Sequence, residues 1–162
     1  MGIFSKKKTN TESKALYDEG MSYIGKDDSK AFEILYKSAK MENELAEFQI
    51  GMMLETGTGT AKDRTESAEW YSDSIDDGCE MAKLYLARLY IQGLDPEFDE
   101  EEATGLLSSL IESDIIGKMT DSTDIISEIA EMLISGKGSF ENLSLGLELK
   151  RTCDEMGNTV RE

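Results

Sequence analysis

A fourfold repeat of small and large residues is the feature that most constrains the fold of this 162-residue chain. The copies begin at Ala15, Ala46, Ala82 and Ile125. In each copy a small residue follows five positions later and a large one three positions after that. In order, these residues are Gly20, Gly51, Ala87 and Ala130, then Tyr23, Leu54, Tyr90 and Leu133. The three positions lie close to one face of a helix, and the small residue lets a neighbouring helix approach closely. The spacing therefore predicts four tightly packed helices.

A second amphipathic helix is predicted after each of these four. Its matching positions form an apolar column and a neighbouring column of mostly small residues. The apolar column holds Ile34, Trp70, Leu106 and Leu149, and the other holds Ser38, Ser74, Leu110 and Cys153. Helical hairpins repeated in series bury their apolar faces against their neighbours. The pattern predicts an all-α solenoid of about four helix-turn-helix repeats, at residues 14–45, 46–81, 82–117 and 125–158.

The segment Gly57-Thr58-Gly59 could be a phosphate-binding loop or the turn between two helices. Phosphate and dinucleotide loops follow a strand and need the spacings GxxxxGK[ST] or GxGxxG. Here the helical pattern FQIGMMLE precedes Gly57, and neither spacing is present. The sequence therefore predicts that Gly57 and Gly59 end a helix with positive φ angles, where a Cβ would be costly.

The second repeat resembles a known repeat family. The residues that carry the resemblance are Gly51, Gly57, Gly59, Asp63, Trp70, Tyr71, Gly78 and Ala82. They are similar to the pattern of the Sel1-like repeat, a relative of the tetratricopeptide repeat. The other copies are degenerate: the first lacks the second loop glycine, the third has only Gly93, and the fourth has Lys150 in the tyrosine column. The resemblance implies a right-handed superhelix in which the first helices line a concave, protein-binding side.

The repeats are expected to form one domain over residues 14–158. Residues 1–13 are expected to be a disordered basic tail, and residues 159–162 a short C-terminal tail. Residues 113–124 are an insertion between the third and fourth repeats. They either pack against the junction or present Ile115, Ile116 and Met119 to a partner.

Charge is the strongest compositional signal, with 34 acidic and 17 basic side chains and a net charge of −17. Such a chain repels nucleic acid and anionic membranes but attracts a basic protein. Solubility alone is an equally good explanation of the charge. No apolar run is long enough to span a membrane, so a cytoplasmic protein is expected, and the resemblance implies a bacterial one.

No catalytic, metal or cofactor site is expected. The chain has no histidine, and Cys79 and Cys153 are too isolated to indicate a disulfide framework or a zinc site. The acidic run that includes Asp95, Glu97, Asp99, Glu100, Glu101 and Glu102 lacks the glycine of a calcium-binding loop. Asp99 is better explained as a helix N-cap that is followed by glutamates in the first turn. The sequence predicts a non-enzymatic protein.

Positions on the first helices that the core does not need are the predicted contact residues. These residues are Asp18, Met21, Gln49, Met52, Met53, Tyr85, Arg88, Glu128 and Glu131. Aromatic, methionine and acidic side chains together suit adaptable protein recognition, although several of them could instead seal neighbouring repeats. We expect a protein–protein interaction module whose partner is a protein or peptide with basic and apolar groups. The alternatives are an acidic immunity or antitoxin-type inhibitor, or a nucleic-acid mimic that occludes a basic effector.

Overall fold

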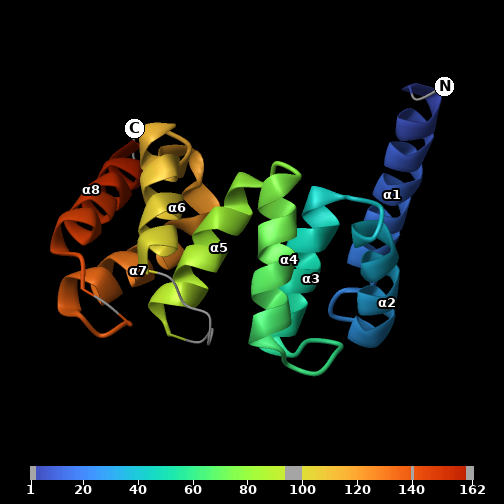
Figure 1. The fold of residues 1–162 in the computed structure, drawn as a ribbon, viewed down its shortest axis with the longest axis horizontal. Coiled ribbons are helices and arrows are strands. Elements are labelled where there is room, and N and C mark those ends of the chain that lie inside the picture. The colour runs from blue at the N-terminus through green and yellow to red at the C-terminus, as the bar shows by residue number, and fades with distance from the viewer. Residues whose placement is uncertain (1–2, 94–99, 140, 160–162) are drawn as a thin grey trace. The chain divides into compact units, whose positions relative to one another are not determined.

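The computed structural model describes residues 3–93, 100–139 and 141–159, and the described residues form helices and no strand (Figure 1). The α-helices are α1 (Ile3–Tyr23), α2 (Asp28–Ala39), α3 (Glu44–Thr56), α4 (Arg64–Asp76), α5 (Glu80–Ile91), α6 (Glu100–Glu112), α7 (Thr123–Ser135) and α8 (Leu143–Thr159). Two short 3-10 helices, η1 (Ile116–Lys118) and η2 (Thr120–Ser122), precede α7. The predicted all-α class is confirmed.

The chain separates into two compact units, Met1–Ala82 and Lys83–Glu162, where we expected a single domain. The boundary lies inside α5. In unit 1, α1 packs against α2, α2 against α3, and α3 against α4. Two helical hairpins therefore lie side by side in unit 1 (Figure 1). Helix α1 begins at Ile3.

Polar side chains start the helices of unit 1. Asp27, Asn43 and Asp63 each accept a hydrogen bond from the backbone N–H three residues later, at 3.1, 3.0 and 3.0 Å. Each bond satisfies an amide that has no partner within its helix. These caps fix where α2, α3 and α4 begin.

The Gly57-Thr58-Gly59 segment is the turn between α3 and α4. Gly57 ends α3 in the left-handed conformation, with φ 79°, and its N–H donates to the carbonyl of Met53 at 2.8 Å. The N–H of Thr58 donates to the same oxygen at 2.9 Å. Gly59 also has a positive φ, 73°, and its backbone lies so close to the Asp28 carbonyl that a Cβ would collide with it. The prediction that these glycines end a helix is confirmed.

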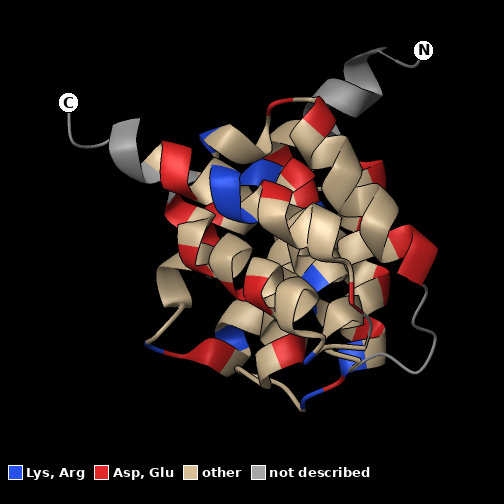
Figure 2. Cartoon of the chain, turned by 90° about the vertical axis from the view of Figure 1, so that its left-hand side faces the viewer, with Lys and Arg blue, Asp and Glu red and all other residues tan. Residues whose placement is uncertain are grey.

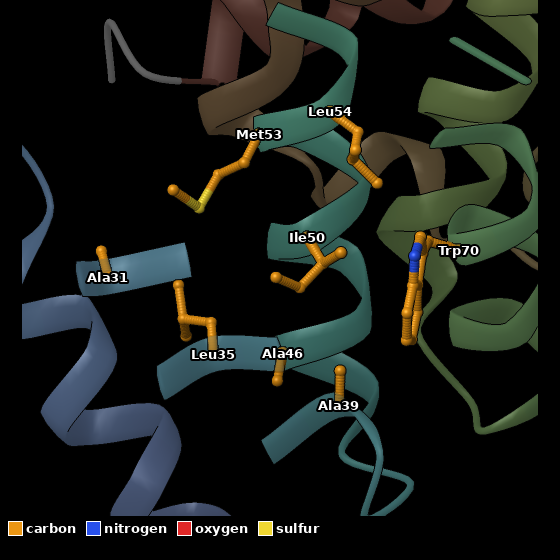
Figure 3. Close-up of a cluster of buried hydrophobic side chains, with 8 residues drawn as sticks. All are labelled: Ala31, Leu35, Ala39, Ala46, Ile50, Met53, Leu54 and Trp70. Atoms are coloured by element: carbon orange, nitrogen blue, oxygen red, sulfur yellow. The ribbon is translucent and has the colours of Figure 1, made fainter. Parts of the chain in front are cut away.

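The small position of the repeat allows close helix packing in unit 1, as predicted. A Cβ added to Gly20 would lie 2.6 Å from Cγ of Leu35 on α2. One added to Gly51 would lie 2.7 Å from the Tyr71 ring on α4. The core between these helices is drawn in Figure 3 and contains Ala31, Leu35, Ala39, Ala46, Ile50, Met53, Leu54 and Trp70.

Buried serines join the two helices of each hairpin in unit 1. The Ser38 hydroxyl donates to the Ser13 carbonyl at 2.6 Å, and the Ser74 hydroxyl donates to the Glu44 carbonyl at 2.7 Å. Ser38 and Ser74 occupy the same column of the repeat. In unit 2 the same column holds Cys153, whose Sγ atom lies 3.9 Å from the Thr123 carbonyl. The column therefore links the second helix to the first in the α1–α2, α3–α4 and α7–α8 hairpins.

The insertion before α7 packs within unit 2. Ile116 and Met119 are buried, and η1 contacts α6 and α8. Residues 113–124 were expected either to pack against the repeat junction or to face a partner. The burial of Ile116 and Met119 fits packing at the junction. Cys79 and Cys153 are both buried and free, and burial raises the pKa of the Cys153 thiol.

Candidate interaction surfaces

Four of the predicted contact residues of unit 1 lie outside the fully buried core. Asp18 is exposed and pairs with Lys14, with 2.9 Å between Nζ and Oδ2. Met21, Gln49 and Met52 are half-buried, and Met21 packs against the core with one side. We call Asp18, Met21, Gln49 and Met52 the first-helix face of unit 1.

The prediction for Met53 is wrong. Its side chain is only 1% exposed and belongs to the core cluster with Leu35 and Ile50 (Figure 3). The core between α2 and α3 is wider than the template positions that we assigned to it. Met53 therefore fills the space between α2 and α3 and cannot contact a partner.

The predicted contact residues of unit 2 lie on α5 and α7. Tyr85 and Arg88 are half-buried, and the Arg88 guanidinium carbon lies 5.0 Å from the centre of the Tyr85 ring. Glu128 is exposed and accepts a hydrogen bond from Gln92 Nε2 at 3.0 Å. Glu128 and Glu131 line a shallow cavity of about 350 Å³ together with Met132, Ile134, Ser135, Lys137 and Lys150. The structure thus brings Glu128 and Glu131 to one hollow in unit 2.

Unit 1 also contains an acidic pocket that the sequence did not predict. Its volume is about 320 Å³, and its walls come from the end of α2, the α2–α3 turn, α3 and α4. The lining residues are Ala39, Lys40, Glu42, Glu47, Trp70, Asp73, Asp76 and Asp77. Five of these residues are carboxylic acids and only one is basic. Figure 2 shows acidic residues on many helices, but here they meet at one concave site.

Glu47 is the buried acid of this pocket. Its side chain is 4% exposed, and none of the described residues hydrogen-bonds to its solvent-shielded Oε2 atom. Burial, reinforced by the negative charge of Asp77, by a hydrogen bond with the Asp77 carboxylate and by the negative charge of Asp73, raises the pKa of Glu47 from 4.5 to about 8. Glu47 is therefore mostly protonated at neutral pH, because an unpaired buried carboxylate is costly.

The aromatic wall of the pocket already holds a cation. The Lys40 ammonium lies 4.5 Å from the centre of the Trp70 ring and 5.3 Å from that of Tyr36. Trp70 and Tyr36 meet edge to face, with 5.6 Å between their centres. Such cation–π contacts use the negative face of the indole ring. The pocket therefore combines carboxylates with an aromatic surface that accepts positive charge.

Comparison with known proteins identifies the repeats. A family model described as Sel1 repeat matches residues 15–43 and 45–79, which cover both hairpins of unit 1. The two hairpins of unit 1 therefore match the Sel1 repeat. Repeats of this type generally mediate protein–protein interactions. None of the curated proteins matches the chain.

Two solved structures share the fold of this chain. One is c5321, a protective antigen of uropathogenic Escherichia coli strains with an SLR fold, at a TM-score of 0.72 and 21% identity. The other is a Sel1 repeat protein from Oxalobacter formigenes, at a TM-score of 0.68 and 21% identity. Each comparison covers 90% of this chain, which spans only 31% of the first protein and 59% of the second. At this identity the likeness concerns the fold.

One column of the repeat bears on the burial of Glu47. The column directly after the first template position contains Leu16, Glu47, Lys83 and Ile126. In the fourth repeat this position is buried, since Ile126 is fully inaccessible. The sequence signal is weak, because the same column also holds Lys83. The acidic neighbours of Glu47, Asp73 and Asp77, come from another helix, so the pocket itself emerges only in three dimensions.

The described residues contain no helix that is long and apolar enough to cross a membrane. They also contain no group of three or more acidic or cysteine side chains arranged to hold a metal ion. Glu100, Glu101 and Glu102 lie in the first turn of α6, as predicted. The proposed N-cap Asp99 and the acidic residues Asp95 and Glu97 fall outside the described residues.

Proposed function

We propose that this protein is a non-catalytic interaction module that binds a protein or peptide with basic and apolar groups. One observation carries the proposal: its Sel1 repeats pack in series, while the first-helix face of unit 1 stays outside the core. A solenoid can use such side chains for contact, because helix pairing and repeat stacking leave them partly exposed.

The chemistry of the first-helix face supports the choice of partner. Asp18 offers negative charge, and Met21 and Met52 offer adaptable, polarisable apolar surface. The net charge of −17 would speed the approach of a basic partner. The same charge supports a second candidate, an immunity or antitoxin-type inhibitor that occludes a basic effector. The bacterial, cytoplasmic setting stays a prediction.

Immobilised peptides that vary independently in basic and apolar content would test the proposal with the full chain as the probe. We expect binding to peptides that combine arginine or lysine with leucine, and weaker binding as salt is raised. Met52→Lys and Asp18→Lys should weaken binding about tenfold, an effect of about 1.4 kcal/mol. Glu69→Lys, at an exposed position of α4 outside this face, is the matched control. Binding that ignores peptide charge, or equal losses in the control, would contradict the proposal.

A further inference from the structure

We propose that the acidic pocket of unit 1 binds an arginine side chain of the partner, with Glu47 and Asp77 holding the guanidinium and Trp70 stacking against it. The inference rests on the proposed function and specifies its partner chemistry. The site is separate from the first-helix face, because its walls come from α2, α3, α4 and the α2–α3 turn.

The shielded Oε2 atom of Glu47 is the first argument. A polar atom shielded from water normally has a hydrogen-bond partner, and leaving one without a partner costs free energy. Glu47 Oε2 is shielded and has no partner among the described residues, although Glu47 lines an open pocket. A donor that enters the pocket would supply the missing bond.

The fourth repeat shows that helix packing does not require this acid. The second and fourth repeats align without insertion or deletion from the first helix to the end of the second. Glu47, Trp70 and Asp77 then correspond to apolar residues of unit 2: Ile126, Leu149 and Met156, all of them buried. A repeat of this type therefore folds with an apolar filling, and apolar replacement of buried charge is often neutral or stabilising. A ligand that binds Glu47 would explain why unit 1 keeps a buried acid at this position.

The shape and chemistry of the pocket favour a guanidinium. A planar guanidinium stacks on an aromatic face and donates two parallel bonds to carboxylates, which an ammonium cannot do. Trp70 supplies the face, and Lys40 shows that a cation is accommodated there, at 4.5 Å. Asp73, Asp76 and Asp77 line the same hollow and are exposed to an incoming cation. An arriving arginine would displace the flexible Lys40 ammonium from the indole.

Binding should exchange a proton for the arginine. The charged groups around Glu47 are Glu44 on α3, Asp73 and Asp77 at the end of α4, and Glu42 and Lys40 on the α2–α3 side. Burial and these negative groups keep Glu47 protonated at neutral pH, whereas a guanidinium in the pocket would favour its ionised form. Because one proton is then released on binding, affinity should rise by up to about tenfold per pH unit as the pH approaches 8.

The test uses the full chain and a leucine-containing peptide with a single arginine. Companion peptides replace that arginine with lysine or with citrulline, its neutral isostere. Two-dimensional NMR follows the indole N–H of Trp70, the only tryptophan in the chain. We expect the arginine peptide to shift this signal and to bind at least about tenfold more tightly than the citrulline peptide. Glu47→Gln and Asp77→Asn should each weaken binding about tenfold, and Glu47→Gln should remove its pH dependence.

Glu69→Gln is the matched control, because Glu69 is exposed on the same helix as Asp73 but does not line the pocket. Equal affinity for arginine and citrulline peptides would overturn the inference, as would binding that both pocket variants leave unchanged. Equal affinity for the lysine peptide would overturn the assignment to arginine. If peptides bind only through the first-helix face, the proposed function stands and the pocket inference fails. If the arginine peptide shifts only Trp70 and its pocket neighbours, the pocket inference stands and the contact face proposed for the module fails.

Discussion

The α3–α4 hairpin of unit 1 and the α7–α8 hairpin of unit 2 solve the same packing problem with different residues. In both, the residue that caps the second helix donates its N–H to the first helix: Asp63 to the Leu54 carbonyl at 3.0 Å, and Asn142 to the Leu133 carbonyl at 3.1 Å. The close approach of the helices depends on Gly51 in unit 1. In unit 2 the glycine is Gly146 on the second helix, where a Cβ would lie 3.0 Å from the Ala130 carbonyl. The hairpin geometry can thus be kept while the small residue changes helices.

The acidic pocket is the difference that packing does not explain. Where unit 1 has Glu47, Trp70 and Asp77, the equivalent positions of unit 2 are apolar and buried. The α3–α4 hairpin therefore keeps an acidic pocket, whereas apolar side chains occupy the equivalent space in the α7–α8 hairpin. The comparison separates residues that make a repeat fold from residues that give it a ligand, and the following changes test that separation.

The largest expected effect is the pH dependence that Glu47 gives to unit 1. Its folded pKa of about 8 lies above the ordinary 4.5, so the folded state binds more protons than the unfolded state between these values. The free energy of unfolding therefore falls as the pH rises through this window, by at most about 1.4 kcal/mol per unit. Glu47→Gln should remove this fall and be more stable than the wild type above pH 8.

Urea unfolding followed by Trp70 fluorescence measures this effect in unit 1, since Trp70 lies there. The quantity to compare is the difference in unfolding free energy between wild type and Glu47→Gln at pH 5, 6, 7 and 8.5. Other acidic groups largely cancel in this difference. A difference that stays constant with pH would refute a raised pKa for Glu47.

Gly51→Ala should have the next largest effect. The new methyl group would lie 2.7 Å from the Tyr71 ring, so either the ring or the helix must move, at a cost of about 2 kcal/mol. In a Tyr71→Ala background the clash with the ring is absent, and the nearest remaining atom to the new methyl group is the Ser67 carbonyl oxygen, at 3.3 Å. Gly51→Ala should then be nearly neutral, because helix propensity offsets this remaining contact. The double-mutant cycle is measured by urea unfolding.

Gly105→Ala on α6 is the control, because a Cβ there would meet no atom within 4 Å. It should be neutral or stabilise unit 2 by up to about 1 kcal/mol, as followed by hydrogen exchange of the α6 amides. Equal destabilisation by Gly51→Ala with and without Tyr71 would show that the ring does not set the requirement for glycine.

Ser74→Ala should cost about 1 kcal/mol, because it removes a buried hydrogen bond to the Glu44 carbonyl. The reciprocal change in unit 2, Cys153→Ser, should alter stability by less than about 0.5 kcal/mol, since the serine hydroxyl can replace a weak thiol contact. Fluorescence unfolding reports the first change, and hydrogen exchange of α8 reports the second. If Ser74→Ala is neutral, the serine column does not stabilise the hairpin.

Glu42→Gly should have the smallest effect. Glu42 has a φ of 57°, whereas the equivalent position of the next turn is Gly78, with a φ of 107°. Relief of the left-handed strain should stabilise unit 1 by about 0.5 kcal/mol in the fluorescence assay. Gly78→Ala is the reciprocal control, because its Cβ has open space and only the backbone angle opposes it. A destabilising Glu42→Gly change would show that the Glu42 side chain contributes more than its backbone costs.

The sequence by itself determined the helical hairpins, their boundaries near the capping residues, and the need for glycine at Gly51 and Gly57. These features depend on the spacing of residues along the chain, on backbone sterics and on hydrogen bonds between residues close in sequence. A repeat pattern contains information on all three. The contact residues on the first helices were predicted in the same way, and they stay a prediction. Met53 is the exception, because its side chain lies in the core.

Only the tertiary structure decided that Met53 is buried, that the chain divides within α5, and that Glu47 meets Asp73 and Asp77 in one pocket. Burial and pKa depend on the atoms that several helices bring together, and no single helix contains that information. Glu47 looks like one of 34 ordinary acids in the sequence. Its environment makes it different, because removal from water and the nearby negative charges oppose its ionisation.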